Sequence, residues 1–356
     1  MELVNQTPIA ASITVGTLDG VDRRCGFVTA KATFVVGDDA RVRLDGRDPF
    51  PIFDHDQPTP LGLLPSDRVP RRDPALEVIV LGRAHGGDRS SMIVDLEVGA
   101  HRRELQVTGD RTWETILGAA RIGAPASIGA MPLTWERAYG GSCECWIDAH
   151  SVLDLEHPWN RLGRGFDAEK LAVDLGKAFK PPRGYPRLDP EHRRRLPNLE
   201  DPRAPIERWA DEPRPYCWAT VPTDVGAHLQ RPHDRLADGR PMTPEEMLTT
   251  IWHRAHPDWI VATPPRESDV TLRGMTPRGL WRFRLPPLRI LADYELGDRG
   301  GTVELAPHLL MLLPEESRFY LVYRRYFTMV VSPATRRSLR LRLAEGWFDV
   351  QGHDPA

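Results

Sequence analysis

The sequence predicts a mainly β protein of the α+β class, with antiparallel sandwich-like or barrel-like sheets, a few short helices and long proline-rich loops. First, the chain has 34 prolines and 29 glycines in 356 residues, too many breakers for long helices. Second, apolar and polar residues alternate over short stretches in both terminal parts. Third, Gly and Asp turns about ten residues apart separate those stretches, as in antiparallel sheets.

Residues 1–131 are predicted to form an N-terminal antiparallel β region. Its strand-like stretches lie at 27–36, 76–82, 92–98 and 103–107, each followed closely by glycine. Between the first two, residues 48–74 are rich in proline and predict a long surface loop.

Residues 132–222 are irregular and rich in Pro, Trp and Arg, and we expect them to pack on the N-terminal region. A helix is predicted at 166–179 from the spacing of its apolar residues. A second helix, at 243–256, begins with a capping box, Thr243-Pro244-Glu245-Glu246. Residues 223–268 therefore read as a variable helical insert.

Residues 269–356 are predicted to form a C-terminal β region. Its strand candidates lie at 270–272, 280–285, 289–296 and 302–305, followed by a hairpin of 308–313 and 319–326. The residues Pro314-Glu315-Glu316-Ser317 supply the turn of that hairpin. The four regions are also compatible with one continuous large domain.

Charge and hydropathy exclude several classes of partner. The 47 basic and 50 acidic residues give a net charge of −3, which predicts neither a nucleic-acid nor an anionic-membrane partner. No stretch approaches the roughly 18 apolar residues of a membrane span, and the N-terminus lacks the pattern of a signal peptide. We therefore expect a soluble, cytoplasmic protein, and four cysteines do not suggest a disulfide framework.

The absence of common enzyme motifs removes hydrolase, kinase and dehydrogenase chemistry as default expectations. The sequence contains no phosphate-binding loop, no His-Glu-x-x-His and no Gly-x-Ser-x-Gly. The alternative is a metal-dependent hydrolase that uses Asp54, His55 and Asp56, or His85. Because the first three lie in the proline-rich stretch, a solvated loop is the favoured interpretation.

A zinc protein is a second form of that alternative. Thiolate and imidazole are ligands that zinc prefers. The candidate ligands are Cys143, Cys145, His150 and His157. A Cys-x-Cys spacing is tight for one tetrahedral ion, so cysteines in a loop without metal are favoured.

The segment 132–141 carries an unusual mixture of aromatic and charged residues. Its alternation predicts a strand with Leu133, Trp135, Arg137 and Tyr139 on one face. A charged pair in such a strand must reach water or find partners. An anion-binding nest is one interpretation. The favoured one is a buried polar scaffold in which Glu136 or Glu200 pairs with Arg137 or Arg164.

Three stretches, in this order, resemble the core of a bacterial family catalogued as domain of unknown function 2169 and linked to type VI secretion. They are PLTWERAYGG (132–141), NRLGRGF (160–166) and LPNLE (196–200). Flanking stretches at 5–8, 31–34, 77–85, 107–113 and 274–286, together with Asp67 and the final hairpin, are also similar. We call the following the signature residues: Trp135, Glu136, Arg137, Tyr139, Gly140, Gly141, Asn160, Gly163, Arg164, Gly165, Phe166, Pro197, Asn198 and Glu200.

The resemblance implies an adaptor or chaperone that binds a toxic effector and helps to mount it on the secretion spike, the VgrG trimer with its PAAR tip. It implies a binding protein and not an enzyme, and it supplies no catalytic residue and no cofactor. The chain departs from the family pattern at Trp159-Asn160-Arg161-Leu162, which replaces a proline step, and over 225–240. We therefore expect the irregular middle and residues 226–268 to carry partner specificity. A third possibility is a secreted effector or a cargo domain carried on the spike.

Overall fold

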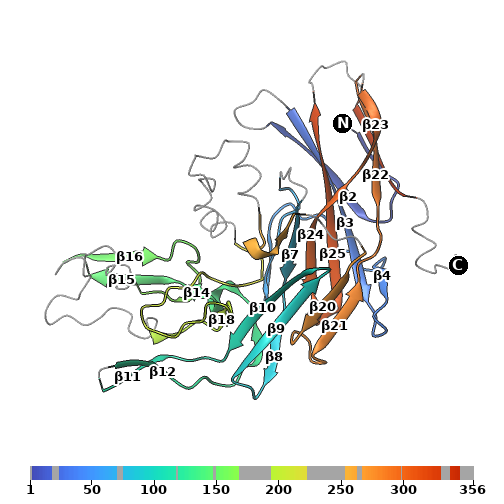
Figure 1. Cartoon of the computed structure of the whole chain (residues 1–356). Coiled ribbons are helices and arrows are strands. Elements are labelled where there is room, and N and C mark those ends of the chain that lie inside the picture. Colours follow the sequence, from blue (N-terminus) through green and yellow to red (C-terminus); the bar gives the residue numbers. More distant parts are fainter. Residues whose placement is uncertain are drawn as a thin grey trace.

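The computed structural model describes residues 2–17, 24–69, 75–117, 119–146, 150–167, 194–222, 253–262, 267–297, 299–329 and 337–344. The prediction of a mainly β protein is confirmed. The described residues form several mostly antiparallel sheets (Figure 1), with no closed barrel and no helix of seven or more residues among them. No helix in this part of the chain has the length and apolar character needed to span a bilayer.

The largest sheet has seven strands. In order they are β19 (Ile260–Val261), β7 (Leu76–Val80), β24 (Ala306–Leu313), β25 (Arg318–Met329), β3 (Arg24–Val36) and β2 (Ala10–Thr17), with β4 (Val42–Leu44) also paired to β3. Only the pair β7–β24 is parallel among these. The C-terminal strands β24 and β25 thus lie between the N-terminal strands β7 and β3 within one sheet.

A five-stranded antiparallel sheet packs against it. Its order is β18 (Leu199–Glu200), β10 (His101–Thr108), β9 (Ser91–Val98), β20 (Asp269–Arg273) and β21 (Leu280–Arg284). The ring of Phe283 stacks on Phe319 of β25 at 4.6 Å, and Phe319 stacks on Phe34 of β3 at 4.9 Å. These three rings join the two sheets as a sandwich core.

A third sheet of four strands extends the same core. It contains β1 (Glu2–Asn5), β26 (Arg337–Leu343), β22 (Ile290–Leu296) and β23 (Arg299–Glu304), in that order. Leu339, Leu341 and Ile290 are fully buried in the main hydrophobic cluster. Tyr294 of β22 meets Phe327 of β25 at 5.5 Å, which ties this sheet to the largest one.

Small two-stranded elements surround these sheets. They are β5 (Gln57–Thr59) with β6 (Gly62–Leu64), β8 (Arg83–Gly87) with β13 (Gly129–Pro132), β11 (Trp113–Ile116) with β12 (Ala119–Ile122), β14 (Tyr139–Gly140) with β17 (Arg164–Gly165), and β15 (Ser142–Trp146) with β16 (Val152–Glu156). The hairpins β11–β12 and β15–β16 lie on the side of the molecule away from β22 and β4 (Figure 1). Three single 3-10 turns complete the described elements: η1 (Trp135–Arg137), η3 (Pro257–Trp259) and η4 (Pro314–Glu316).

The strands predicted from alternation are confirmed as β3, β7, β9, β10 and β20 to β25, with η4 at the predicted turn. The prediction of a surface loop over 48–74 was wrong in part. That stretch contains the hairpin β5–β6, and both Leu64 and Asp67 are buried. The predicted helices at 166–179 and 243–256 fall mainly outside the described residues.

A buried ion pair explains why the proline-rich stretch is held against the sheet. Lys31 of β3 and Asp67 are both fully buried and form a salt bridge. The ammonium of Lys31 also donates to the carbonyl of Pro51 at 2.9 Å and lies 3.7 Å from the centre of the Phe53 ring. Asp67 accepts from the backbone N–H of Phe53 at 2.7 Å. The pair therefore fixes two points of the stretch to the central sheet.

Candidate interaction site

The segment 132–141 is not the extended strand that its alternation predicts. Pro132 is the last residue of β13, Trp135–Arg137 form the turn η1, and strand structure returns only at Tyr139–Gly140. The indole N–H of Trp135 donates to the carbonyl of Ala219 at 3.1 Å, and its ring stacks on His256. Burial of one large ring against two distant segments outweighs the local preference for an extended chain.

Asn160 holds this turn in place. Its side chain is fully buried, and its amide donates to the carbonyls of Trp135 at 2.9 Å and of Tyr139 at 3.0 Å. Its side-chain oxygen accepts from the backbone N–H of Leu162 at 3.2 Å. One amide therefore satisfies main-chain groups that a regular strand would have paired with a neighbour.

The glycines of the signature allow the chains to approach one another. Gly140 has φ +140°, and a Cβ there would lie 2.1 Å from the carbonyl oxygen of Asn160. At Gly163 a Cβ would lie 2.6 Å from the carbonyl oxygen of Ala138. Gly141 and Gly165 have φ +106° and +91°, a region that favours glycine. The close packing of β14 against β17 needs these residues to lack side chains.

A second buried amide organises the arginines. Asn198 donates to the carbonyl of Thr108 at 2.9 Å and to Asp110 at 3.0 Å, and it accepts from Arg137 at 3.1 Å. Arg164 donates to the carbonyl of Glu136 at 2.9 Å and lies 3.3 Å from Asp110. The predicted pairing of these arginines with the carboxylate of Glu136 or Glu200 was wrong. The carboxylate near both guanidinium groups is that of Asp110, 3.6 Å from Arg137 and 3.3 Å from Arg164.

Glu200 is buried in β18 and pairs with Arg111. It also accepts from the backbone N–H of Ile206 at 3.0 Å. Burial raises the pKa of this carboxyl above its usual value, although Arg111 opposes the shift. The preceding Pro197 lies beside Gly165, whose Cβ would meet the proline ring at 3.3 Å. This part of the signature is therefore a packed scaffold.

An aromatic cage surrounds His157. Its ring meets Tyr139 at 5.2 Å and Phe166 at 5.4 Å, both edge to face. The Nδ1 atom accepts from the backbone N–H groups of Trp159 and Asn160, each at 3.2 Å. Burial lowers the pKa of His157 to about 4, so the ring is neutral at pH 7.

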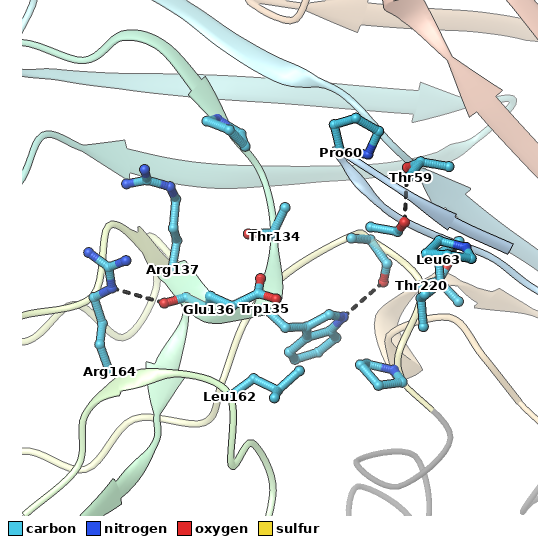
Figure 2. A pocket seen from close by; sticks show the side chains of 15 residues that line it. Thr59, Pro60, Leu63, Thr134, Trp135, Glu136, Arg137, Leu162, Arg164 and Thr220 are labelled. Atoms are coloured by element: carbon cyan, nitrogen blue, oxygen red, sulfur yellow. Dashed lines mark hydrogen bonds between the residues drawn. The ribbon is translucent and has the colours of Figure 1, made fainter. Parts of the chain in front are cut away.

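The exposed parts of the signature surround an open hollow of about 520 Å³. Figure 2 shows Arg137 and Arg164 on one side of it, and Thr59, Pro60, Leu63 and Thr220 on the opposite side. The remaining lining residues are Pro58, Gly62, Pro132, Thr134, Trp135, Glu136, Leu162, Ala219 and Pro222. Four separate segments of the chain therefore meet around this space.

The predicted zinc ligands do not come together as a set. Cys143 and Cys145 are buried on one face of β15, with their sulfur atoms 3.5 Å apart. His150 is exposed, whereas His157 uses its Nδ1 as a hydrogen-bond acceptor within the aromatic cage. Within the described ranges, no three His, Cys, Asp or Glu side chains are arranged to hold a metal ion.

The candidate hydrolase residues have separate partners. Asp56 binds Arg254 at 2.7 and 3.0 Å, and Glu77 accepts from the backbone N–H of Ala255 at 3.0 Å beside it. Asp54 pairs with Arg68 at the surface. His85 lies 2.9 Å from Glu315. Asp56 thus ties the proline-rich stretch to Arg254, and Glu77 of β7 ties the next residue to the largest sheet. Neither group forms a common site with His85.

Sequence reasoning missed Asp110 and Arg111 as site residues. Both lie in the stretch 107–113, which resembles the family, and that similarity was the signal that could have found them. It also missed Thr59, Leu63 and Thr220, which line the hollow but carry no motif.

Comparison with known families gives one match. The model of a bacterial family, described as an uncharacterized protein conserved in bacteria (DUF2169), matches residues 21–324. This range includes all the signature residues and the hollow. No curated protein and no solved structure is significantly similar to the chain.

Proposed function

The chain belongs to the DUF2169 family of uncharacterised bacterial proteins, and from this premise we propose that it is a cytoplasmic, non-catalytic adaptor. It binds an effector of a type VI secretion system and helps to load it on the VgrG or PAAR spike. The resemblance of residues 132–141, 160–166 and 196–200 to such adaptors is the starting point of the proposal.

The observation that carries it is the role of the signature residues. Asn160 and Asn198 bind backbone carbonyls, the glycines permit close approach, and Glu200 is paired with Arg111. These contacts fix the shape of a surface and place Arg137 and Arg164 beside an open hollow. A rigid, preformed surface lowers the entropy cost of binding a protein partner.

Co-purification tests the proposal. We expect a tagged chain, expressed from its own locus in a bacterium with an active type VI system, to retain a toxic effector together with VgrG or a PAAR protein. Deletion of the gene should remove that effector from the culture medium, and the intact gene should restore it. Retention of neither class of protein, or unchanged secretion in the deletion strain, would contradict the adaptor function.

Two further measurements separate the alternatives. An adaptor stays in the cell, so accumulation of this chain itself in the medium would identify it as secreted cargo. Stoichiometric zinc in the purified protein would favour the metal-dependent alternative.

Residues 226–268, which lie mostly outside the described ranges, are proposed to set partner choice. Exchange of this segment with that of a related adaptor should change the effector retained in a pull-down. Unchanged partner choice would place specificity elsewhere.

A further inference from the structure

The hollow beside the signature residues has two unlike walls. On one wall, Pro58, Pro60 and Leu63 present a rigid apolar surface. On the other, Arg137 and Arg164 present guanidinium groups, with side chains 25% and 21% exposed. Leu162 completes the apolar lining, and its side chain reaches solvent. An extended peptide, whose side chains alternate between two directions, can place an apolar group on one wall and a charged group on the other.

The two arginines are held in position by the protein. The Nε of Arg164 donates to the carbonyl of Glu136, and Arg137 donates to Asn198. Both share Asp110, at 3.3 and 3.6 Å, and the Asp110 side chain is 69% exposed. A guanidinium carries five N–H donors, so these contacts leave donors for a further acceptor.

Arg164 has two cationic and two acidic neighbours, so the group that includes Arg164 itself carries three positive and two negative charges. Arg137 and Arg195 both act on Arg164, whereas the acidic groups acting on it are Asp110 and Glu136. Burial first, and then these neighbouring cations, lower the pKa of Arg164. An additional carboxylate would therefore relieve repulsion between like charges and form charge-assisted hydrogen bonds.

We propose that the hollow receives an extended segment of the effector, and that an Asp or Glu side chain of this segment binds Arg137 and Arg164. The inference rests on the proposed adaptor function and adds the chemistry of the contact. A volume of about 520 Å³ holds a few side chains and not a folded domain, so the occupant is a short segment of a larger partner.

Peptide binding tests this directly. The probes are overlapping fifteen-residue peptides that cover the co-purified effector, and the measurement is fluorescence anisotropy with the full-length chain. One region should bind, and replacement of its acidic residue by the corresponding amide should weaken binding by roughly tenfold.

Two variants of the chain test the charged wall and the open space of the hollow separately. Arg164→Glu should weaken the same peptide by roughly tenfold or more, because it reverses the charge at the wall. Thr134→Phe should block the hollow sterically, and it removes no cap, since the Thr134 side chain makes no capping hydrogen bond. The matched control is Arg278→Glu, at an exposed arginine paired with Asp38 that does not line the hollow. Thermal unfolding shows that each variant is folded.

The outcomes distinguish this inference from the function on which it rests. If Arg164→Glu and Thr134→Phe both bind the peptide as tightly as wild type while the effector still co-purifies, the hollow is not the docking site. The adaptor function is then unaffected. If no effector co-purifies, the adaptor function fails. Degenerate peptides with a central Glu or a central Gln then test the hollow, and equal binding of the two sets overturns the carboxylate contact.

Discussion

Lys31 and Asp67 form a charged pair in which both side chains are fully buried. We predict that Asp67→Asn lowers the free energy of unfolding by about 3–5 kcal/mol, because it leaves the Lys31 charge buried without its counter-ion. The matched control is Asp54→Asn, in the surface pair with Arg68, which should cost about 0–1 kcal/mol. Urea unfolding at pH 7 measures both, and equal effects would contradict the distinction.

The same variant has a pH signature. Burial lowers the pKa of Lys31 to about 8, and Asp67 opposes that shift. In Asp67→Asn the folded chain releases the Lys31 proton at lower pH than wild type, whereas both unfolded chains keep it to about 10.5. The free energy of unfolding of the variant therefore rises with pH over a range where wild type does not. Its deficit should shrink as the pH rises from 6 towards about 8, and a constant deficit would contradict this.

The buried amide of Asn160 gives another residue-scale prediction. Asn160→Ala removes donors from two carbonyls and the acceptor of the Leu162 N–H, so we expect a loss of about 2–3 kcal/mol. Asn5→Ala, at an exposed asparagine whose amide binds the carbonyl of Ile9, should cost only about 0.5–1 kcal/mol. Chemical denaturation compares the two, and a loss at Asn160 no greater than that at Asn5 would argue against its structural role.

Residue types were easier to predict than residue pairs. The stretches that carry Lys31, Asp67, Asn160 and Asn198 stood out in the sequence because of their resemblance to a family. The contacts between these groups depend on how distant segments of the chain fold together. Neither the charge nor the spacing of the residues in the sequence predicts those contacts. Asp110 illustrates this point, since it takes the place between Arg137 and Arg164 that the sequence assigned to Glu136 or Glu200.

Among the secondary-structure elements, the pair β14–β17 depends most directly on glycine. Gly140→Ala would place a Cβ 2.1 Å from a backbone oxygen, and we expect a loss of more than about 3 kcal/mol. Gly129→Ala is the matched control, with φ +61° and no atom within 4 Å of the added Cβ. It should cost about 1 kcal/mol from backbone conformation alone. Similar thermal stability of the two variants would show that the close approach is unimportant.

The hairpin β11–β12 has an unfavourable residue at its turn. Leu117 follows the last residue of β11, has φ +52° and is fully exposed. Leu117→Asn creates Asn-Gly, the favoured sequence for such turns, so we expect hydrogen exchange at the hairpin amides to slow by several-fold, for a gain of about 0.5–1 kcal/mol. Leu117→Val should accelerate exchange, because a β-branched residue resists positive φ. Unchanged exchange in both variants would contradict the strain at this turn.

Alternation predicted the strands of the large sheets well, because each buries one face or both in a shared core. It failed at 132–141, where the ring of Trp135 packs between distant segments and Asn160 replaces strand pairing. Proline content misled at 48–74, where it predicted a surface loop. There the burial of Leu64 and Asp67 holds a short hairpin against the sheet.

At the scale of the whole molecule, the sequence predicted the class of fold but not the strand order. β7 pairs in parallel with β24, more than two hundred residues later in the chain, and β19 pairs with the other edge of β7. Such non-local pairing is decided by the collective burial of all strands and leaves no local pattern. The hollow could not be predicted for the same reason, because four separate segments between Pro58 and Pro222 line it.

The half-buried His157 and the buried His256 predict how the whole molecule responds to acid. Burial lowers the pKa of His157 and of His256 to about 4, whereas an unfolded chain protonates histidine near 6.5. Between these values the unfolded state binds more protons, so stability that is present above pH 6.5 is lost as the pH falls towards about 4. We expect each histidine to contribute on the order of 2–3 kcal/mol to this loss.

The double variant His157→Asn, His256→Asn isolates this contribution, because both rings accept backbone N–H groups at Nδ1 and the side-chain oxygen of asparagine can occupy a similar place. The variant should be less stable than wild type at pH 7 and should lose less stability between pH 6.5 and 4.5, as measured by urea unfolding. His157 lies in the cage of Tyr139 and Phe166, and His256 packs on Trp135. Acid therefore weakens the packing of Tyr139 and of Trp135, which lie next to these two histidines. Identical pH profiles of stability for the variant and wild type would exclude the histidines as the cause.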